Sequence, residues 1–301
     1  MPGTDGPATP RALLQQGTVR LQRAGCEHAE RESAWLLSAL TGIAPLELYL
    51  ATAPLPAATV ERFLAQVDVR AQGTPLQYIL GETEFFGLRV AVEPGVFIPR
   101  PETEAVVEAM LAALQLLQAE AGRPLRVLDL GTGSGCIALT LAHRLPACLV
   151  VGVELSWGSL LAACANAARL GVTERVRWVQ GNWLEGIRGP VDAIISNPPY
   201  VPTAQVDRLP LDVRCEPRLS LDGGTDGMRD LRTLIAEAPR VLRPGGVLAL
   251  ECGEEQAAEL LALARSARWV ATATALADLA GRPRGILVHR TRSTAARADE
   301  A

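Results

Sequence analysis

The spacing of apolar residues divides the chain into an N-terminal helical part and a longer part in which strands alternate with helices. Between residues 11 and 73 apolar side chains recur at helical spacing, and Phe63, Leu64 and Val67 lie three, four and seven positions after Val60. This spacing gives a helix one apolar face. It therefore predicts a small helical bundle whose apolar residues form a core of their own.

From residue 124 onward, apolar segments of strand length alternate with helical segments, an order typical of βαβ units. The expected strands lie near residues 127–130, 149–153, 176–179, 191–195, 247–251, 269–272 and 285–289. They predict an α/β fold with a mostly parallel, doubly wound sheet. Between the two parts, residues 78–92 change to strand-like alternation around a turn near Gly87, which predicts a β-hairpin.

Length and composition fit one large domain with a smaller one attached, because 301 residues lie near the upper limit for a single core. No apolar segment is long enough to cross a membrane, and the first ten residues lack a secretory signal pattern. We therefore expect a cytoplasmic protein without a membrane partner. The net charge of −4 argues against a protein that follows a nucleic-acid backbone.

The cysteines and histidines give no metal-binding pattern. Six cysteines are scattered without a Cys-x-x-Cys pair, and the chain has three histidines. We therefore expect no metal site.

A glycine-rich turn follows the first expected strand and opens a helix. Its residues are Gly131, Thr132, Gly133, Ser134 and Gly135. Glycine is needed where the backbone turns sharply or approaches a ligand closely. The dinucleotide-binding fingerprint has its third glycine one residue later, where Cys136 stands, so a pyrophosphate site is disfavoured. The turn instead fits a smaller ligand group.

Polar residues at the ends of the next two strands suit a nucleoside. Glu154 follows the second strand, where an acidic residue commonly binds the two ribose hydroxyls. Asn182 and Trp183 follow the third strand and are placed to meet the edge and the face of an adenine. S-adenosylmethionine, a nucleoside with an amino-acid tail, satisfies these observations better than NAD.

The sequence Asn197-Pro198-Pro199-Tyr200 follows the apolar strand at 191–195. Ligands of open α/β sheets bind at the carboxyl ends of the strands, and two consecutive prolines hold the following backbone stiff. The Asn197 side-chain carbonyl and the Pro198 backbone carbonyl can each accept one hydrogen bond from a planar NH2 group. Tyr200 can pack against its flat face. These four residues therefore predict a site that directs a planar nitrogen toward an electrophile.

With these residues the chain resembles class I S-adenosylmethionine-dependent methyltransferases, and among them the peptide chain release factor N5-glutamine methyltransferases, the PrmC or HemK family. The resemblance rests on residues 75–78 with Gly81, 97–104, 131–135, 196–200, 216–217, 223–224, 226–227, 243–246 and 251–253. It covers nearly the whole chain. Residues 97–104 are far more specific to the family than the glycine turn.

The resemblance implies a helical N-terminal domain that helps to recognise a protein substrate, and a seven-stranded methyltransferase domain. It also implies methylation of the glutamine side chain in the Gly-Gly-Gln motif of class 1 release factors. In this chain residues 131–135 would then hold the methionine portion of the cofactor, Glu154 the ribose and Trp183 the adenine region. Residues 197–200 would hold the substrate glutamine, with Asn197 also beside the cofactor. Glu154 and Asn182 stand where many members have Asp, so altered contacts are expected.

Residue composition and pattern, together with the resemblance, set the expected domain boundaries. They are a disordered N-terminus at 1–10, a helical substrate-recognition domain at 11–75, a β-hairpin linker at 76–97, the methyltransferase domain at 98–292 and a flexible tail at 293–301. We expect a monomer that makes no direct contact with nucleic acid.

Three alternatives stay open from the sequence. A sister glutamine methyltransferase acting on a ribosomal protein would share the catalytic segment. An adenine-N6 DNA methyltransferase would bind a similar planar NH2 group after base flipping, although the acidic charge argues against it. An inactive cofactor-binding protein is the third alternative, and the intact residues at 197–200 argue against it.

Overall fold

The computed structural model describes residues 9–292, and the expected flexible tail at 293–301 lies outside this range. Of the expected disordered N-terminus only residues 9 and 10 are described, and Pro10 already opens the first helix with Thr9 as its cap. The described chain forms two compact units. The first contains the residues up to Glu82 together with Pro210–Cys215, and the second contains Thr83–Leu209 and the residues from Glu216.

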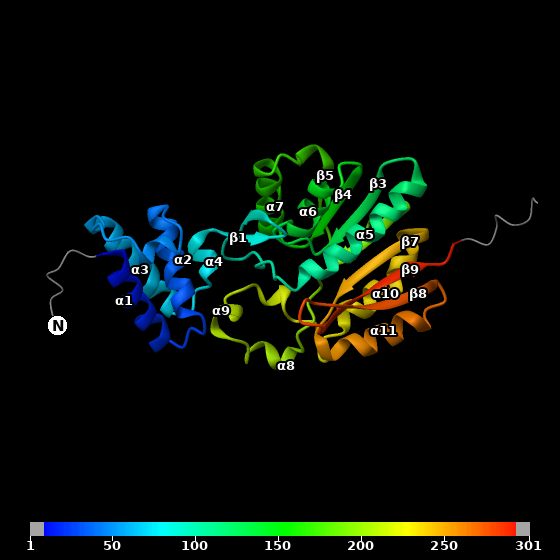
Figure 1. Ribbon diagram of the computed structural model, residues 1–301. Coiled ribbons are helices and arrows are strands. Elements are labelled where there is room, and N and C mark those ends of the chain that lie inside the picture. The colour runs from blue at the N-terminus through cyan, green and yellow to red at the C-terminus, as the bar shows by residue number, and fades with distance from the viewer. Residues whose placement is uncertain (1–8, 293–301) are drawn as a thin grey trace, which may run out of the picture. The chain divides into compact units, whose positions relative to one another are not determined.

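The first unit is a helical bundle, as the apolar spacing predicted. Its helices are α1 (Pro10–Arg23), α2 (Ala29–Thr41), η1 (Glu47–Tyr49), α3 (Ala57–Ala71), α4 (Leu76–Leu80) and α9 (Leu211–Arg214) (Figure 1). Phe63 and Val67 of α3 are fully buried in its core with Leu36 and Leu37 of α2. Gly17 of α1 allows this close packing, because a Cβ there would lie 2.7 Å from the Phe63 ring.

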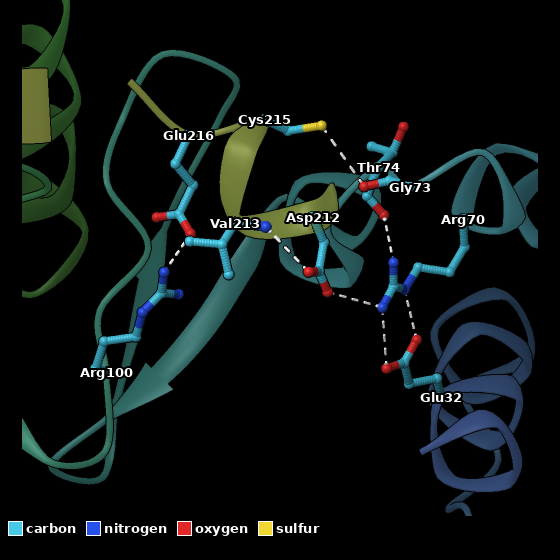
Figure 2. Close-up of polar contacts among 9 residues, drawn as sticks. All are labelled: Glu32, Arg70, Gly73, Thr74, Arg100, Asp212, Val213, Cys215 and Glu216. Atoms are coloured by element: carbon cyan, nitrogen blue, oxygen red, sulfur yellow. Dashed lines mark hydrogen bonds and ion pairs between the residues drawn. The ribbon is translucent and has the colours of Figure 1, made fainter. Parts of the chain in front are cut away.

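A buried arginine holds α9 in the helical unit, a grouping that the sequence did not predict (Figure 2). Arg70 of α3 donates to both carboxylate oxygens of Glu32 on α2, at 2.6 and 3.3 Å, and to Oδ2 of Asp212 on α9 at 3.0 Å. Gly73 contacts Leu211 so closely that a Cβ would lie 2.3 Å from its side chain. Arg70 therefore joins three helices through charge pairs.

The second unit contains the predicted sheet of seven strands. They are β3 (Leu125–Leu130), β4 (Cys148–Glu154), β5 (Val176–Gln180), β6 (Val191–Ser196), β7 (Leu242–Glu251), β8 (Val270–Ala277) and β9 (Pro283–Arg290). Their order is β5-β4-β3-β6-β7-β9-β8, and β9 alone among these seven runs in the direction opposite to the others. The predicted doubly wound α/β fold is confirmed.

Helices cover both faces of this sheet (Figure 1). One face carries α5 (Thr103–Ala121), α6 (Cys136–Arg144) and α7 (Trp157–Arg169), and the other carries α10 (Arg229–Val241) and α11 (Ala257–Ser266). Alternate residues of each central strand enter the two cores, as Ala193 and Ile194 of β6 show. Every residue of β6 is buried, which explains its nearly continuous apolar sequence.

Short elements complete the chain. They are the hairpin strands β1 (Glu82–Phe85) and β2 (Leu88–Ala91), α8 (Thr203–Val206), η2 (Thr173–Arg175), η3 (Arg218–Ser220) and η4 (Glu254–Gln256). The hairpin confirms the strand-like alternation around Gly87, and Leu88 and Val90 are buried against the sheet core. The first residues of the expected hairpin linker, 76–80, instead form the helix α4. Within residues 9–292 no helix combines the length and the apolar character needed to cross a membrane.

The strand order reverses at β3, because β4 lies on one side of it and β6 on the other. A crevice opens at the carboxyl ends of strands where such a reversal occurs. Ser196, at the end of β6, donates its hydroxyl to the Leu130 carbonyl at the end of β3, with an O···O distance of 2.6 Å. The glycine turn and residues 197–200 therefore leave the sheet side by side.

Candidate functional site

A pocket of about 520 Å³ lies at this edge of the sheet, lined entirely by residues of the second unit. Of the residues that the sequence singled out, its lining includes Gly131, Thr132, Gly133, Ser134, Glu154, Asn182, Trp183, Asn197 and Pro199. Gly135, Pro198 and Tyr200 are not part of this lining. The structure thus brings together every residue predicted for the cofactor except Gly135, with two of the four predicted for the substrate.

A buried carboxyl group supports the glycine turn from below. Asp129 Oδ2 accepts hydrogen bonds from the Thr132 hydroxyl at 2.5 Å and from the Ala138 N–H at 3.0 Å. Burial raises the pKa of Asp129 to about 7. Its other oxygen, Oδ1, is buried without a hydrogen-bond partner among the described residues. Asp129 therefore ties the start of the turn to the first turn of α6.

The turn needs glycine at its first position for two reasons. Gly131 has a φ of +71°, which disfavours any side chain. A Cβ at this position would also lie 3.3 Å from the Trp183 ring. The backbone of the turn and the indole are thus in close contact on the wall of the pocket.

Glu154 lies at the end of β4 and uses each carboxylate oxygen once. Oε2 accepts from the Gly133 N–H and Oε1 from the Ser156 N–H, both at 2.9 Å. An ionised carboxylate has about four acceptor positions. Both oxygens can therefore still accept a hydrogen bond from a vicinal diol, although the side chain is one methylene longer than the Asp of many family members.

Asn182 and Trp183 are oriented by carboxylates beside them. The Asn182 NH2 group donates to Glu185 Oε1 at 3.0 Å, which leaves its Oδ1 free to accept. The Trp183 indole N–H donates to Asp230 Oδ1 at 3.2 Å. Trp183 has a φ of +49°, which is uncommon for a bulky residue and marks a local constraint. An acceptor edge and an aromatic face thus meet at one end of the pocket.

Asn197 follows β6 directly and is fixed by the start of α5. Its NH2 group donates to the Thr103 hydroxyl oxygen at 3.1 Å. Tyr200 is outside the pocket lining: its hydroxyl donates to Glu251 Oε1 at 3.4 Å, and burial raises the pKa of Tyr200. The Tyr200 carbonyl accepts from the Gln256 side chain at 2.8 Å. The expectation that Tyr200 packs against a substrate amide stays a prediction.

Two glycines allow another segment to pack directly against this loop. A Cβ on Gly223 would lie 2.6 Å from the Pro199 carbonyl oxygen, and one on Gly227 would lie 2.1 Å from the Tyr200 carbonyl oxygen. Backbone hydrogen bonds between Val201 and residues 221 and 223 complete the contact. The glycines at 223 and 227, part of the family resemblance, are therefore explained by close backbone approach.

Sequence reasoning gave no role to three polar residues of this region. Thr103 and Glu251 lie within the segments that carry the resemblance, and Asp230 lies beside one of them. Glu251 ends an apolar strand, the same signal that identified Glu154. No comparable signal marks Thr103 or Asp230, because their partners are 94 and 47 residues away in the chain.

Comparison with known families agrees with this geometry. The family model described as the PrmC N-terminal domain matches residues 12–81, and the methyltransferase small domain matches residues 87–209. The release factor glutamine methyltransferase of Moorella thermoacetica is 43% identical over 284 residues, which cover 94% of this chain and 99% of that protein. This chain belongs to the release factor glutamine methyltransferases. The predicted resemblance is confirmed.

Other relatives carry the same family name. The release factor glutamine methyltransferase of Bradyrhizobium diazoefficiens is 40% identical over 89% of this chain and 90% of its own length. Among solved structures, the hMettl16 catalytic domain in complex with MAT2A 3'UTR hairpin 1 matches with a TM-score of 0.53 at 15% identity, over 81% of this chain and 84% of that one. At this identity the likeness shows a shared fold alone.

Proposed function

We propose that this chain transfers a methyl group from S-adenosylmethionine to the side-chain amide nitrogen of the glutamine in the Gly-Gly-Gln motif of class 1 release factors. One observation carries the proposal: Asn197 lines the pocket with its NH2 group already engaged by Thr103, so that its carbonyl oxygen is available to an incoming amide. Family membership over 94% of the chain supports it.

The pocket fits the proposed cofactor. Glu154 has spare acceptor positions for the ribose hydroxyls, and Asn182 offers a free Oδ1 to the adenine amino group. Trp183 presents an aromatic face for the adenine, and the absent Cβ of Gly131 lets its indole pack against the glycine turn that would hold the methionine portion. When bound, S-adenosylmethionine supplies an electrophilic methyl group.

Asn197 and Pro198 are proposed to hold the substrate glutamine. The Asn197 Oδ1 accepts from one N–H of the glutamine amide and the Pro198 carbonyl from the other. Among the described residues no hydrogen bond to the Pro198 carbonyl is formed, so this acceptor is available. Tyr200 supports the loop through its hydroxyl and its backbone carbonyl.

These contacts address the weak nucleophilicity of an amide. Its nitrogen lone pair is delocalised into the carbonyl group, so positive charge on nitrogen must be stabilised as the N–C bond forms and the S–C bond breaks. Two fixed carbonyl oxygens stabilise this charge through the N–H groups and align the nitrogen with the methyl carbon. The nitrogen then releases one proton to water, and N5-methylglutamine is left.

The helical unit is proposed to bind the body of the release factor. Its residues 12–81 match the family's N-terminal domain model, and no residue of the proposed methyl-transfer pocket lies in this range. We further propose that the protein acts as a monomer in the cytoplasm, where release factors are found. Gel filtration with light scattering tests the monomer.

The deciding experiment is methyl transfer from labelled S-adenosylmethionine to a purified class 1 release factor. The same factor with its Gly-Gly-Gln glutamine changed to alanine serves as the control, beside ribosomal protein and DNA. We expect label on the unchanged factor alone. Label on ribosomal protein or on DNA, with none on the factor, would replace the proposed substrate.

A further inference from the structure

A chain of polar contacts leads from Asn197 into the interior of the second unit. The Asn197 NH2 group donates to Thr103 Oγ1 at 3.1 Å. The Tyr200 hydroxyl group donates to Glu251 Oε1 at 3.4 Å, and the Thr103 hydroxyl group lies beside the same carboxyl group, where it lowers the pKa of Glu251. Thr103 is the first residue of α5, Glu251 the last of β7, and Asn197 follows β6. Three separate elements therefore meet behind the proposed substrate contact.

The two residues behind Asn197 are deeply buried. Thr103 is 2% exposed and Glu251 is 1% exposed. Glu251 Oε2 has no hydrogen-bond partner among the described residues, so this carboxyl group has unused capacity to accept. Glu102 raises the pKa of Glu251 and Arg284 lowers it, and the ion pair of Arg284 is with Asp278.

The Glu251 carboxylate determines the donor and the acceptor in each hydrogen bond of this series. An ionised carboxylate can only accept, whereas a hydroxyl group both donates and accepts, and a side-chain amide donates from one end and accepts at the other. With Glu251 ionised, the carboxylate beside Thr103 is the acceptor to which the Thr103 proton is directed. The Thr103 oxygen is then left to accept, and only the NH2 end of Asn197 can donate to it.

We propose that Thr103 and Glu251 are positioning residues, which hold the Asn197 amide with its carbonyl oxygen toward the acceptor nitrogen. The proposal rests on the proposed function, because it assigns Asn197 to the substrate amide. In the reversed orientation the Asn197 NH2 group would face the substrate NH2 group. Two donors would then oppose each other, and the developing positive charge on nitrogen would lose one of its two stabilising oxygens.

Replacement of Thr103 by Val removes the acceptor and keeps the shape of the side chain. We expect kcat to fall by about tenfold to a hundredfold, comparable to the loss of one preorganised polar contact. Because Thr103 also lines the pocket, the dissociation constant for S-adenosylmethionine is measured by calorimetry and kcat is taken at saturating cofactor. Thr103→Ser restores the hydroxyl group and should recover most of the wild-type kcat.

A matched control separates positioning from the general effect of removing a buried threonine hydroxyl. Thr140 is fully buried in α6, donates to the Cys136 carbonyl at 2.7 Å and is not part of the pocket lining. Thr140→Val should therefore leave kcat near that of the wild type. Equal losses of kcat in Thr140→Val and Thr103→Val would overturn the proposal.

Glu251→Gln tests the direction of these hydrogen bonds without changing the shape of the side chain. The new NH2 group can donate to Thr103, which can then donate to the Asn197 carbonyl oxygen and turn the amide around. We expect kcat to fall in this variant at pH 8.5. Burial raises the pKa of Glu251 to about 7, so the wild-type carboxyl group is ionised there.

The double variant Thr103→Val/Glu251→Gln tests whether Thr103 and Glu251 act on Asn197 in series or have two separate structural roles. Since Glu251 acts on Asn197 through Thr103, Glu251→Gln should reduce kcat no further once Thr103 is Val. Multiplied losses, or wild-type kcat in Thr103→Val, would reject the inference. If the wild-type protein fails to methylate the release factor, the proposed function has failed instead. If Thr103→Val does not fold, a wild-type kcat in Glu251→Gln rejects the inference and a loss supports it.

Discussion

Glu154 accepts a hydrogen bond from the Gly133 backbone N–H at 2.9 Å, and so joins the ends of two neighbouring parallel strands. The contact gives one carboxylate two tasks: it fixes the middle of the glycine turn and presents oxygens toward the pocket. Both tasks depend on a group that only accepts. A side chain of the same length that also carries an NH2 group should therefore impair cofactor binding.

Glu154→Gln is expected to raise the dissociation constant for S-adenosylmethionine by about tenfold to a hundredfold, since hydrogen bonds to charged groups contribute about 1.5–3 kcal/mol. The glutamine NH2 group would also oppose the N–H of either Gly133 or Ser156. Calorimetric titration measures the effect. Glu174→Gln, an exposed change outside the pocket, is the matched control and should bind like the wild type. Unchanged affinity in Glu154→Gln would remove the proposed ribose contact.

Asn197→Ala should separate catalysis from cofactor binding. Loss of one of the two proposed carbonyl contacts to the glutamine amide is expected to lower kcat by about a hundredfold or more. The dissociation constant for S-adenosylmethionine should change much less, because Glu154, Asn182 and Trp183 stay in place. Steady-state kinetics with release factor measure kcat, and near-normal turnover would contradict the role of Asn197.

The sequence predicted the sheet and the residues at its strand ends, because both leave local signals. Apolar segments of strand length identify buried strands, and a polar residue directly after such a segment, as at Glu154 and Asn197, lies at the ligand-binding edge. The partners of these residues leave no such signal. Thr103 meets Asn197 across 94 residues, and Arg70 meets Asp212 across 142. Such pairs depend on tertiary packing, which spacing along one chain does not encode.

The buried carboxyl group of Glu251 should make stability depend on pH. Burial raises its pKa from an ordinary 4.5 to about 7, with Glu102 raising it further and Thr103, Tyr200 and Arg284 lowering it. Between these values the folded protein keeps a proton that the unfolded chain releases. The contribution of this proton to the free energy of unfolding is therefore complete below about pH 4.5. It is lost as the pH rises from there through about 7, by about 1.4 kcal/mol per pH unit.

Glu251→Gln removes this proton exchange. The free energy of unfolding of the variant, relative to that of the wild type, should therefore increase between pH 5 and pH 7 and level off above pH 8. Urea unfolding of both proteins at several pH values measures the difference. Asp129, whose pKa is also raised to about 7 by burial, is present in both proteins and cancels in the comparison. Parallel pH curves would show that Glu251 does not titrate in this range.

Arg70 should be important for the helical unit, because its side chain is 8% exposed and pairs with a Glu32 side chain that is 11% exposed. Arg70→Met would leave that carboxylate buried without its partner, which typically costs about 3–5 kcal/mol. Arg20→Met breaks the exposed pair with Asp68 and should cost about 1 kcal/mol or less. Hydrogen exchange of α2 and α3 amides compares the variants, and equal protection would refute the assigned role of Arg70.

Gly227 and Gly281 have nearly the same backbone conformation, so alanine variants of the two separate the effect of close packing against residues 197–200 from that of conformational strain. Gly227 has a φ of +75° and Gly281 a φ of +78°. A Cβ on Gly227 would lie 2.1 Å from the Tyr200 carbonyl oxygen, whereas a Cβ on Gly281 meets nothing within 4 Å. Alanine therefore introduces the same backbone strain at both positions, about 1–2 kcal/mol, and a clash at one of them.

Gly227→Ala is expected to displace residues 197–200, because the clash is with backbone and cannot be relieved by rotating a side chain. Methyl transfer to the release factor should fall by about tenfold or more at saturating cofactor, since a small misplacement of a reacting group is enough to slow the reaction strongly. Gly281→Ala should keep wild-type kcat despite its loss of stability. If both variants lose stability equally and both keep kcat, the packing of Gly227 against Tyr200 does not position residues 197–200 for the proposed reaction.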